Sequence, residues 1–172
     1  MSAHASDWLI ENLDLIVREE AVLDVASGRG RHALYLARRG WQVVAIDRDP
    51  AALSSLDSQC RALGCAITTR VLDLEQDGVD LGVERYGTIL VFNYLYRPLV
   101  PQLVRALKAG GVLLYETFRV GQEKRGHPRN PAFLLAAGEL PALVAPLVPV
   151  RSREGDINGK LIASIAARKQ LP

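Results

Sequence analysis

Short apolar runs alternate with amphipathic stretches along most of this chain. Between the runs, leucines recur at helical spacing, and glycine, proline or acidic residues mark the junctions. Strands that alternate with helices in this way predict βαβ units and a parallel sheet. We expect parallel strands over residues 21–26, 42–46, 66–72, 87–92 and 112–117. The first is a nearly continuous apolar run and is therefore expected to be buried on both faces.

Capping and breaking residues set the expected limits of the helices. Ser6 or Asp7 can cap a first helix whose apolar face carries residues 9, 13, 16 and 17. Asp49-Pro50 begins a helix that buries residues 53, 56, 60 and 63 and ends at Gly64. We expect two further helices, over residues 31–39 and 98–108, with Gly110-Gly111 ending the second.

The last third of the chain has a different pattern. Residues 119–131 are polar, and residues 138–144 form a short expected helix. Residues 148–153 and 161–168 then read as two strands around Asn158-Gly159, a strong signal for a tight hairpin turn. An antiparallel hairpin is therefore expected to close an otherwise parallel sheet.

Composition and charge exclude some classes of protein but do not by themselves indicate a function. A length of 172 residues suits one domain, and a formal net charge of +2 gives no general signal for nucleic acid or membrane. The most apolar long window, 132–150, contains three prolines and Glu139, so we expect no membrane span. Acidic residues at 7, 11 and 14 interrupt the N-terminal apolar residues, so we expect no signal peptide. We interpret Cys60 and Cys65 as ordinary thiols, which fits a cytoplasmic protein, and we see no metal-binding pattern.

Polar residues follow the expected parallel strands at corresponding places. In a doubly wound sheet, ligands bind at the carboxyl ends of the strands. Glycines in the first turn let backbone approach a ligand closely, and an acidic residue after the second strand can accept the hydroxyls of a ribose. These strand-end positions are the segment from Asp24 to Gly30, followed by Asp47, Asp73, Asn93 and Glu116.

A dinucleotide such as NAD and S-adenosylmethionine (SAM) both use such a site, and three features favour SAM. The carboxylate of Asp24 would repel a pyrophosphate but not a sulfonium or ammonium group. The turn lacks the third glycine of the dinucleotide fingerprint. The terminal hairpin replaces the second parallel half of a dinucleotide-binding fold.

The stretch DVASGRGRHALYLARRGWQVVAID, residues 24–47, resembles motif I and the following acidic strand end of class I SAM-dependent methyltransferases. The resemblance implies an α/β, Rossmann-like three-layer αβα sandwich over one domain, residues 1–172. Its sheet would have seven strands in the order 3-2-1-4-5-7-6, mostly parallel with the last strand antiparallel. FNYLYRP (92–98) and the later YETF and GHPRNPAFLL segments are most similar to small bacterial tellurite-resistance and thiopurine methyltransferases.

The same resemblance implies a cofactor site. Asp24, Ala26, Ser27, Gly28 and Gly30 would hold the methionine part of SAM, with alanine at the place of a usual motif glycine. The ribose would lie at the second strand end, and the adenine beside the third. The further residues expected to bind cofactor are Asp47, Arg48, Asp73, Leu74 and Asn93.

The acceptor side is less sharply indicated. Asn93 could orient a nucleophile and Tyr94 could position it, although either tyrosine of this segment could equally be a packing residue. The cationic loop 119–131 could cover an anionic substrate or simply be solvated, and His32 is expected to be structural. The residues expected at the substrate are Tyr96, Arg97, Glu116, Arg119 and His127.

We therefore expect methyl transfer from SAM to a small-molecule or metalloid acceptor. Three alternatives stay open at this point: an RNA or protein methyltransferase, a non-catalytic SAM-binding module, and an NAD-binding domain. The sequence leaves the acceptor and the oligomeric state undetermined.

Overall fold

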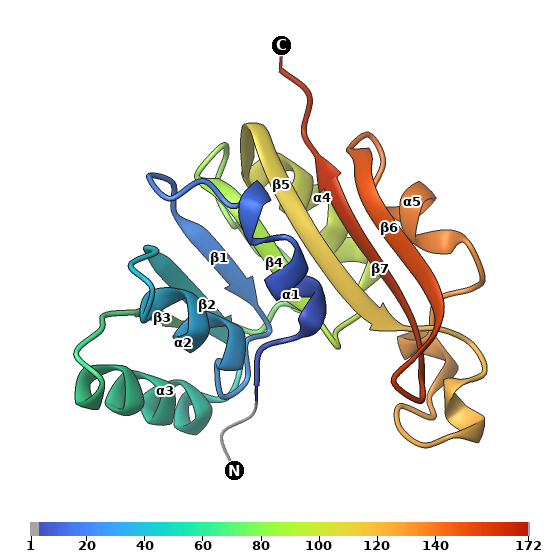
Figure 1. Ribbon diagram of the computed structural model, residues 1–172, viewed down its shortest axis with the longest axis horizontal. Coiled ribbons are helices and arrows are strands. Elements are labelled where there is room, and N and C mark those ends of the chain that lie inside the picture. The colour runs from blue at the N-terminus through green and yellow to red at the C-terminus, as the bar shows by residue number, and fades with distance from the viewer. Residues whose placement is uncertain (1–3, 172) are drawn as a thin grey trace.

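The seven strands found in residues 4–171 join one sheet in the order β3-β2-β1-β4-β5-β7-β6 (Figure 1). The computed structural model describes residues 4–171. Strand β7 is antiparallel to both of its neighbours, whereas the pairs from β3 to β5 are parallel. The predicted fold class and strand order are both confirmed. The strands are β1 Val22–Val25, β2 Val43–Asp47, β3 Thr68–Val71, β4 Tyr86–Phe92, β5 Leu107–Phe118, β6 Val148–Ile157 and β7 Lys160–Arg168.

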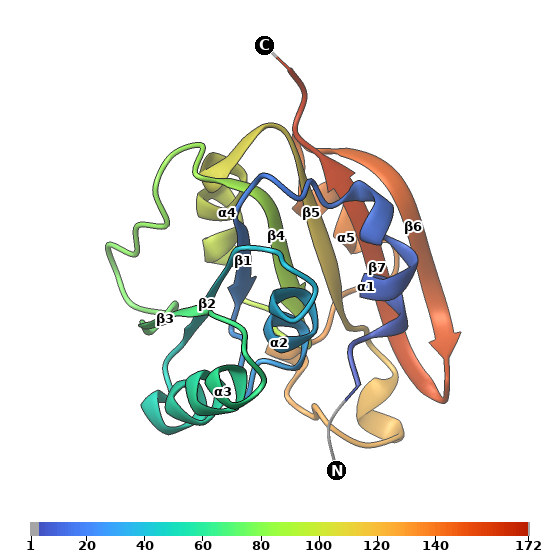
Figure 2. The ribbon, with the colours of Figure 1, turned by 60° about the vertical axis from the view of Figure 1, so that its left-hand side comes forward.

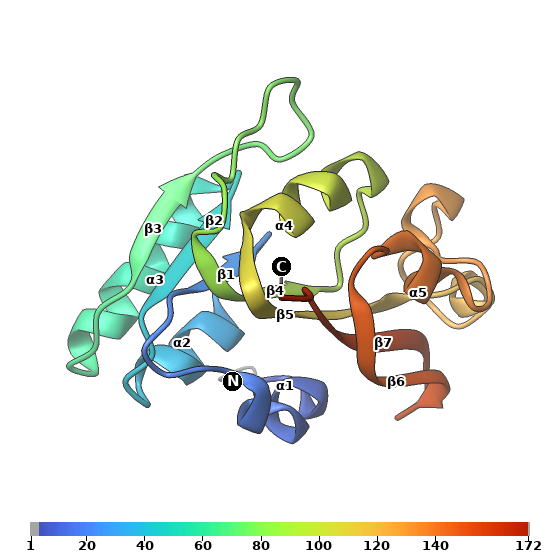
Figure 3. The ribbon, with the colours of Figure 1, turned by 90° about the horizontal axis from the view of Figure 1, so that it is seen from above.

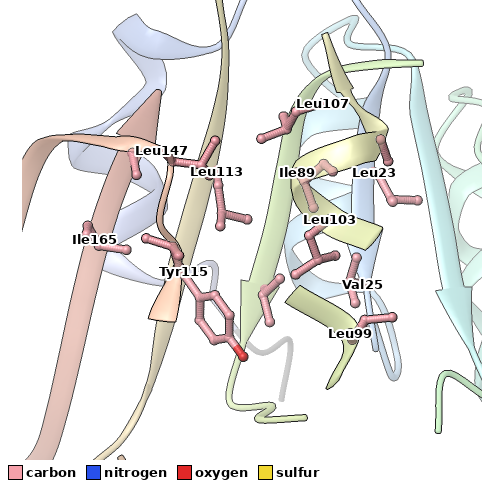
Figure 4. Packing of buried hydrophobic residues seen from close by; sticks show 14 of the residues in the cluster. Leu23, Val25, Ile89, Leu99, Leu103, Leu107, Leu113, Tyr115, Leu147 and Ile165 are labelled. Carbon is pink, nitrogen blue, oxygen red and sulfur yellow. The ribbon is translucent and has the colours of Figure 1, made fainter. Parts of the chain in front are cut away.

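The helices cover both faces of this sheet (Figure 3). One buried cluster joins α1, α2 and α3 to the sheet, and a second cluster joins α4 and α5 to the opposite face. Leu23, Leu103 and Ile165 belong to the second cluster and are fully or almost fully buried (Figure 4). The helices are α1 Asp7–Glu11, α2 Arg31–Ala37, α3 Pro50–Ala62, α4 Val100–Ala106 and α5 Glu139–Leu143, and the short 3-10 turns are η1 Leu13–Leu15, η2 Arg97–Leu99, η3 Gln122–Lys124 and η4 Pro131–Phe133.

The carboxyl ends of β1, β2, β4 and β5 meet at one edge of the sheet. Their parallel registers bring Val25 level with Ile46 and Val91, and Phe92 level with Glu116. The β6–β7 turn and the segment that follows β5 lie at this same edge (Figure 1). The fold therefore collects the expected site residues and the terminal hairpin at one place.

The hairpin turn forms as its sequence predicts. Asn158 and Gly159 have φ angles of 52° and 79°, the positive pair that a type I′ turn requires. The turn places β7 between β5 and β6, and the apolar run from Ile162 to Ala167 is buried there.

The N-terminal helix is shorter than predicted. Helix α1 ends at Glu11, because the buried Asn12 donates its side-chain amide to the carbonyl of Trp8 at 2.7 Å and η1 follows. Val17, expected on the buried face, is 50% exposed. The remaining apolar residues hold α1 against the β5–β7 part of the sheet (Figure 2), where the Trp8 indole donates to the carbonyl of Ile165.

The start of the fifth strand also differs from the prediction. Helix α4 ends at Ala106, and β5 begins at Leu107, before the glycine pair that was expected to end the helix. Leu107 pairs with Tyr86, and the register then shifts. A Cβ on Gly111 would lie 2.9 Å from the Lys108 carbonyl oxygen and 3.0 Å from that of Gly87. The glycine therefore permits a close backbone approach inside a strand.

The interpretation of the cysteines as thiols is wrong in this structure, where Cys60 and Cys65 form a disulfide. Gly64, with φ 70°, reverses the chain after α3, and the Cys65 amide donates to the Cys60 carbonyl at 2.9 Å. This hydrogen bond is the long one of a Schellman motif, which brings these two positions together. The predicted burial of Leu63 is also wrong, since this C-cap residue is 51% exposed.

Because Cys60 and Cys65 form a disulfide, they give no support to the expected reducing compartment. Within residues 4–171, none of the helices has the length and apolar character needed to span a bilayer.

Candidate functional site

Three adjoining cavities form a groove across the carboxyl edge of the sheet. Their volumes are about 580, 300 and 270 Å³, and Asn93 lines all of them. Ala26 is shared by the first and second cavities, and Arg31 by the second and third. A ligand could therefore extend from the end of β2 past the glycine turn to the end of β5.

The glycine turn between β1 and α2 forms the wall of the second cavity. Ala26, Gly28 and Gly30 have φ angles of 51°, 55° and 69°. A Cβ on Gly28 would meet nothing within 4 Å, whereas one on Gly30 would lie 2.3 Å from the Leu56 side chain. Gly30 is thus required by packing against α3, whereas Gly28 has open space at its Cβ position but is not among the residues that line the three cavities. The left-handed backbone at residue 26 explains why a glycine is usual there.

Asp47 joins the glycine turn to the end of β2. Its Oδ2 accepts from the Gly28 amide at 2.7 Å, and its Oδ1 accepts from the Asp49 amide at 2.9 Å. The carboxylate lines the first cavity together with Arg48. Each oxygen keeps a lone pair for a ligand hydroxyl.

Asp24 is a buried carboxyl group under the second cavity. Its pKa is raised to about 7, mainly by burial and to a smaller extent by the nearby Asp47. The Ala33 amide, which donates to Oδ2 at 3.1 Å, and the charge of Arg31 lower this pKa but do not cancel the effect of burial. A cation in the second cavity would therefore favour the ionised form of Asp24.

His32 lines the same cavity from the first turn of α2. Its ring lies 4.0 Å from the ring of Phe92, and burial lowers its pKa to about 3, with Arg31 lowering it further. The imidazole is consequently neutral at physiological pH and contributes a flat wall rather than a charge.

The expected adenine region lies in the first cavity. Leu72, Asp73, Leu74 and Glu75 follow β3 and line it, with Leu95 from the segment after β4. The Asp73 carboxylate accepts from the Glu75 amide at 3.0 Å, which fixes the turn. This part of the groove therefore combines an apolar wall with carboxylates at its rim.

Asn93 and Tyr94 occupy the junction between the cavities. Asn93 has a φ of 56°, and its amide donates to the Glu116 carbonyl at 2.9 Å. Tyr94 lines the first cavity, and its carbonyl accepts from the Tyr115 hydroxyl at 2.9 Å; Figure 4 shows that tyrosine within the core. Burial raises the pKa of the Tyr94 phenol above its ordinary value, so this group stays protonated.

Glu116 lies at the third cavity in a closed network of hydrogen bonds. Its Oε1 accepts from the Ser6 hydroxyl at 2.6 Å, and its Oε2 accepts from the Ser164 hydroxyl at 2.7 Å and from Arg153 at 3.2 Å. The residue is 7% exposed. Its charge is therefore compensated by the protein, and it connects α1, β5, β6 and β7.

Of the other residues expected at the substrate, one lines the groove and the others are engaged elsewhere in the protein. His127 lines the first cavity. Arg97 instead pairs with Glu139 at 2.6 Å, which lowers the pKa of that carboxyl, and Arg119 pairs with Glu154 at 3.1 Å. Tyr96 is half-buried and packs against the core beside α4. Of these four, only His127 belongs to the lining of the groove.

Several lining residues were not expected from the sequence. Arg29 and Arg31 line the second cavity from within the quoted motif, where their charge could have drawn attention. Four further lining residues lie at the end of β5 and in the segment after it, within the quoted YETF and GHPRNPAFLL segments, but their residue types alone do not point to a ligand. These are Thr117, Phe118, Pro128 and Phe133.

Within residues 4–171, we find no group of three or more His, Cys, Asp or Glu side chains placed to hold a metal ion.

A family model described as "Methyltransferase domain" matches residues 22–111, just over half of the chain. This range contains the glycine turn, Asp47, Asp73 and Asn93. It excludes Glu116 and everything later in the chain. The family match therefore covers the part of the groove assigned to the cofactor and little of the acceptor side.

The chain is also similar to TehB of Haemophilus influenzae, described as a probable S-adenosyl-L-methionine-dependent methyltransferase. Identity is 26% over 87 residues, which are 51% of this chain and 30% of that protein. The match thus spans less than a third of the relative's length.

Solved structures show the same fold. The crystal structure of TehB from Haemophilus influenzae matches with a TM-score of 0.82 and 20% identity, covering 96% of this chain and 63% of that one. A SAM-dependent methyltransferase of Methanosarcina mazei matches with a TM-score of 0.76 and 16% identity, covering 99% and 100%. From the family match and the strand order together, the chain belongs to the methyltransferase-domain family, in its class I SAM-dependent group.

Proposed function

We propose that this protein transfers a methyl group from SAM to a small-molecule or metalloid acceptor. The observation that carries the proposal is the continuous groove that joins the glycine turn, Asp47 and Asn93. A site for SAM needs room for a nucleoside, an amino-acid part and an incoming acceptor, and the three cavities, which share Asn93, offer that room.

The residues present fit the cofactor. The open space beside Gly28 admits a ligand against backbone, and Asp47 has acceptor capacity left for ribose hydroxyls. Leu72 and Leu74 supply an apolar wall for a base, with Arg48 and Asp73 at the rim. Asn93 lies where the nucleoside and amino-acid parts would meet.

The charge pattern also suits this cofactor. Asp24 and Asp47 place two carboxyl groups along the turn, and SAM carries a sulfonium and an ammonium group. The remaining members of the proposed amino-acid site are Ala26, Ser27 and Gly30. A pyrophosphate at this turn would instead lie beside Asp24, which disfavours the dinucleotide alternative.

Bound SAM would supply an electrophilic methyl group on its sulfonium, so alignment of the acceptor accounts for much of the required catalysis. Correct positioning of two reactants is worth roughly 7–11 kcal/mol. We assign that positioning to Asn93, whose side chain can hydrogen-bond an acceptor, and to Tyr94, whose neutral phenol lines the first cavity. His127 lines the same cavity and is proposed to contact the acceptor.

A screen with radiolabelled SAM tests the proposed activity. We expect label to enter a compound in a pool of small metabolites or metalloid salts. The Asn93→Gly variant, which tolerates the positive φ but lacks the amide, should bind SAM and transfer label at least about tenfold more slowly, since misplaced reactants cost up to 10²-fold. Label entering only RNA or protein would contradict the small-acceptor proposal, and SAM binding without any labelled product would favour the non-catalytic module.

Asp47→Ala tests the ribose assignment. Loss of a charged hydrogen-bond acceptor should weaken SAM binding by at least about 1 kcal/mol, measured by calorimetry. Asp57→Ala is the control, because Asp57 lies on α3 and pairs only with Arg61 four residues later. An Asp47→Ala protein that is folded and binds SAM as the wild type does would remove Asp47 from the site.

Asp24→Asn tests the buried carboxyl through pH. A folded pKa of about 7 against 3.8 means that the ligand-free wild type loses stability as pH rises through this range. Between pH 5 and pH 7.5 the loss should be on the order of 2 kcal/mol larger in wild type than in Asp24→Asn, by urea denaturation. SAM affinity should rise over the same range in wild type alone. Identical pH profiles for the two proteins would show that Asp24 is ionised throughout.

A further inference from the structure

The third cavity differs from the other two in the origin of its walls. Ser6 and Asp7 come from the start of α1, Arg31 from the start of α2, and Lys160 from the hairpin turn. It meets the second cavity at Arg31 and Asn93. An occupant of this space would therefore lie beside the amino-acid end of the proposed cofactor site and not beside the nucleoside end.

The charges of Arg153 and Glu116, which both line this cavity, compensate each other. Arg153 donates to Glu116 at 3.2 Å, and it also pairs with Glu11 at 3.1 Å. Its guanidinium lies 4.8 Å from the Trp8 ring centroid. Glu116 accepts two serine hydroxyls in addition, as described above. This pair forms a fixed wall and leaves little charge for a ligand.

Arg31 and Lys160 are the cations that remain at this cavity. Neither forms an ion pair or a side-chain hydrogen bond with the residues that the structure describes. Arg31 is half-buried and Lys160 is exposed. The lining also contains the Asp7 carboxylate, which accepts from the Asn158 amide at 3.5 Å and forms no ion pair with the described residues. Two cations against one carboxylate leave the described lining with a net positive charge.

The cationic loop after β5 is different. Arg119 pairs with Glu154 at 3.1 Å and Arg125 pairs with Asp156. Much of the positive charge that the sequence places in residues 119–131 is thus matched by β6. At the third cavity, the cations that form no ion pair with the described residues are Arg31 and Lys160.

From this arrangement we propose that the acceptor carries an anionic group, a carboxylate or an inorganic oxyanion, which Arg31 and Lys160 hold in the third cavity. The proposal rests on the proposed methyl transfer and names its substrate class. A volume of about 270 Å³ lies just below the usual range for ligand pockets, so the anionic part must be small. Asn93 would then face the acceptor from the opposite wall.

The test uses the protein saturated with S-adenosylhomocysteine, the demethylated form of the cofactor. Benzoate and its neutral isostere benzamide are titrated by calorimetry, with inorganic phosphate as a third probe. In parallel, the indole resonance of Trp8 is followed by NMR, since its neighbour Arg153 lines the cavity. We expect benzoate or phosphate to bind at least about tenfold more tightly than benzamide and to shift this resonance.

Lys160→Met is the deciding variant, because Lys160 lines the third cavity but not the second. It should weaken anion binding about tenfold and leave the affinity for S-adenosylhomocysteine unchanged. Arg31→Met should weaken anion binding as well. Lys124→Met, a change in the cationic loop, should have no effect on the anion. Tighter binding of phosphate than of benzoate would assign the site to an inorganic oxyanion, and the reverse to a carboxylate.

Two results would overturn the proposal: neither benzoate nor phosphate binding more tightly than benzamide, or a loss of anion binding in Lys124→Met but not in Lys160→Met. Failure of the wild type to bind S-adenosylhomocysteine would instead contradict the proposed function. Titration of the wild type with S-adenosylhomocysteine therefore distinguishes failure of the anionic-acceptor proposal from failure of the proposed function.

Discussion

The hydrogen bond from the Gly28 amide to the Asp47 carboxylate is the contact on which the groove depends. It links the turn after β1 to the end of β2, where Asp47 lines the first cavity. Parallel pairing of β1 with β2 and β4 brings the participating strand ends together. Under the proposed function, the carboxylate that organises the turn would also accept a ribose hydroxyl, so one side chain would serve both structure and binding.

Most of the fold could be predicted because its signals are local. Apolar runs, capping residues and the Asn158-Gly159 turn each determine a short piece of structure, and the methyltransferase resemblance supplies the strand order. The errors arise where one local contact overrides a pattern. The buried Asn12 ends α1 early, and Gly111 lies inside β5 rather than before it. The Cys60–Cys65 disulfide follows from a helix-ending geometry that spacing alone did not identify.

The residues proposed for the cofactor carry a clearer sequence signal than those proposed for the acceptor. The former lie within one continuous motif and at strand ends, and the family match covers the same range. The proposed acceptor side is assembled from α1, the segment after β5 and the terminal hairpin, which are far apart in the sequence. Pairing of Arg97 with Glu139 and of Arg119 with Glu154 depends on tertiary packing, so charge alone could not show which cations face the groove.

Calorimetric titration of the wild-type protein with SAM and, separately, with NAD is the most direct test of the account. The buried carboxyl of Asp24, the turn at Gly28 and the acceptor capacity of Asp47 predict one binding site for SAM and no measurable binding of NAD. Binding of NAD without binding of SAM would contradict the account.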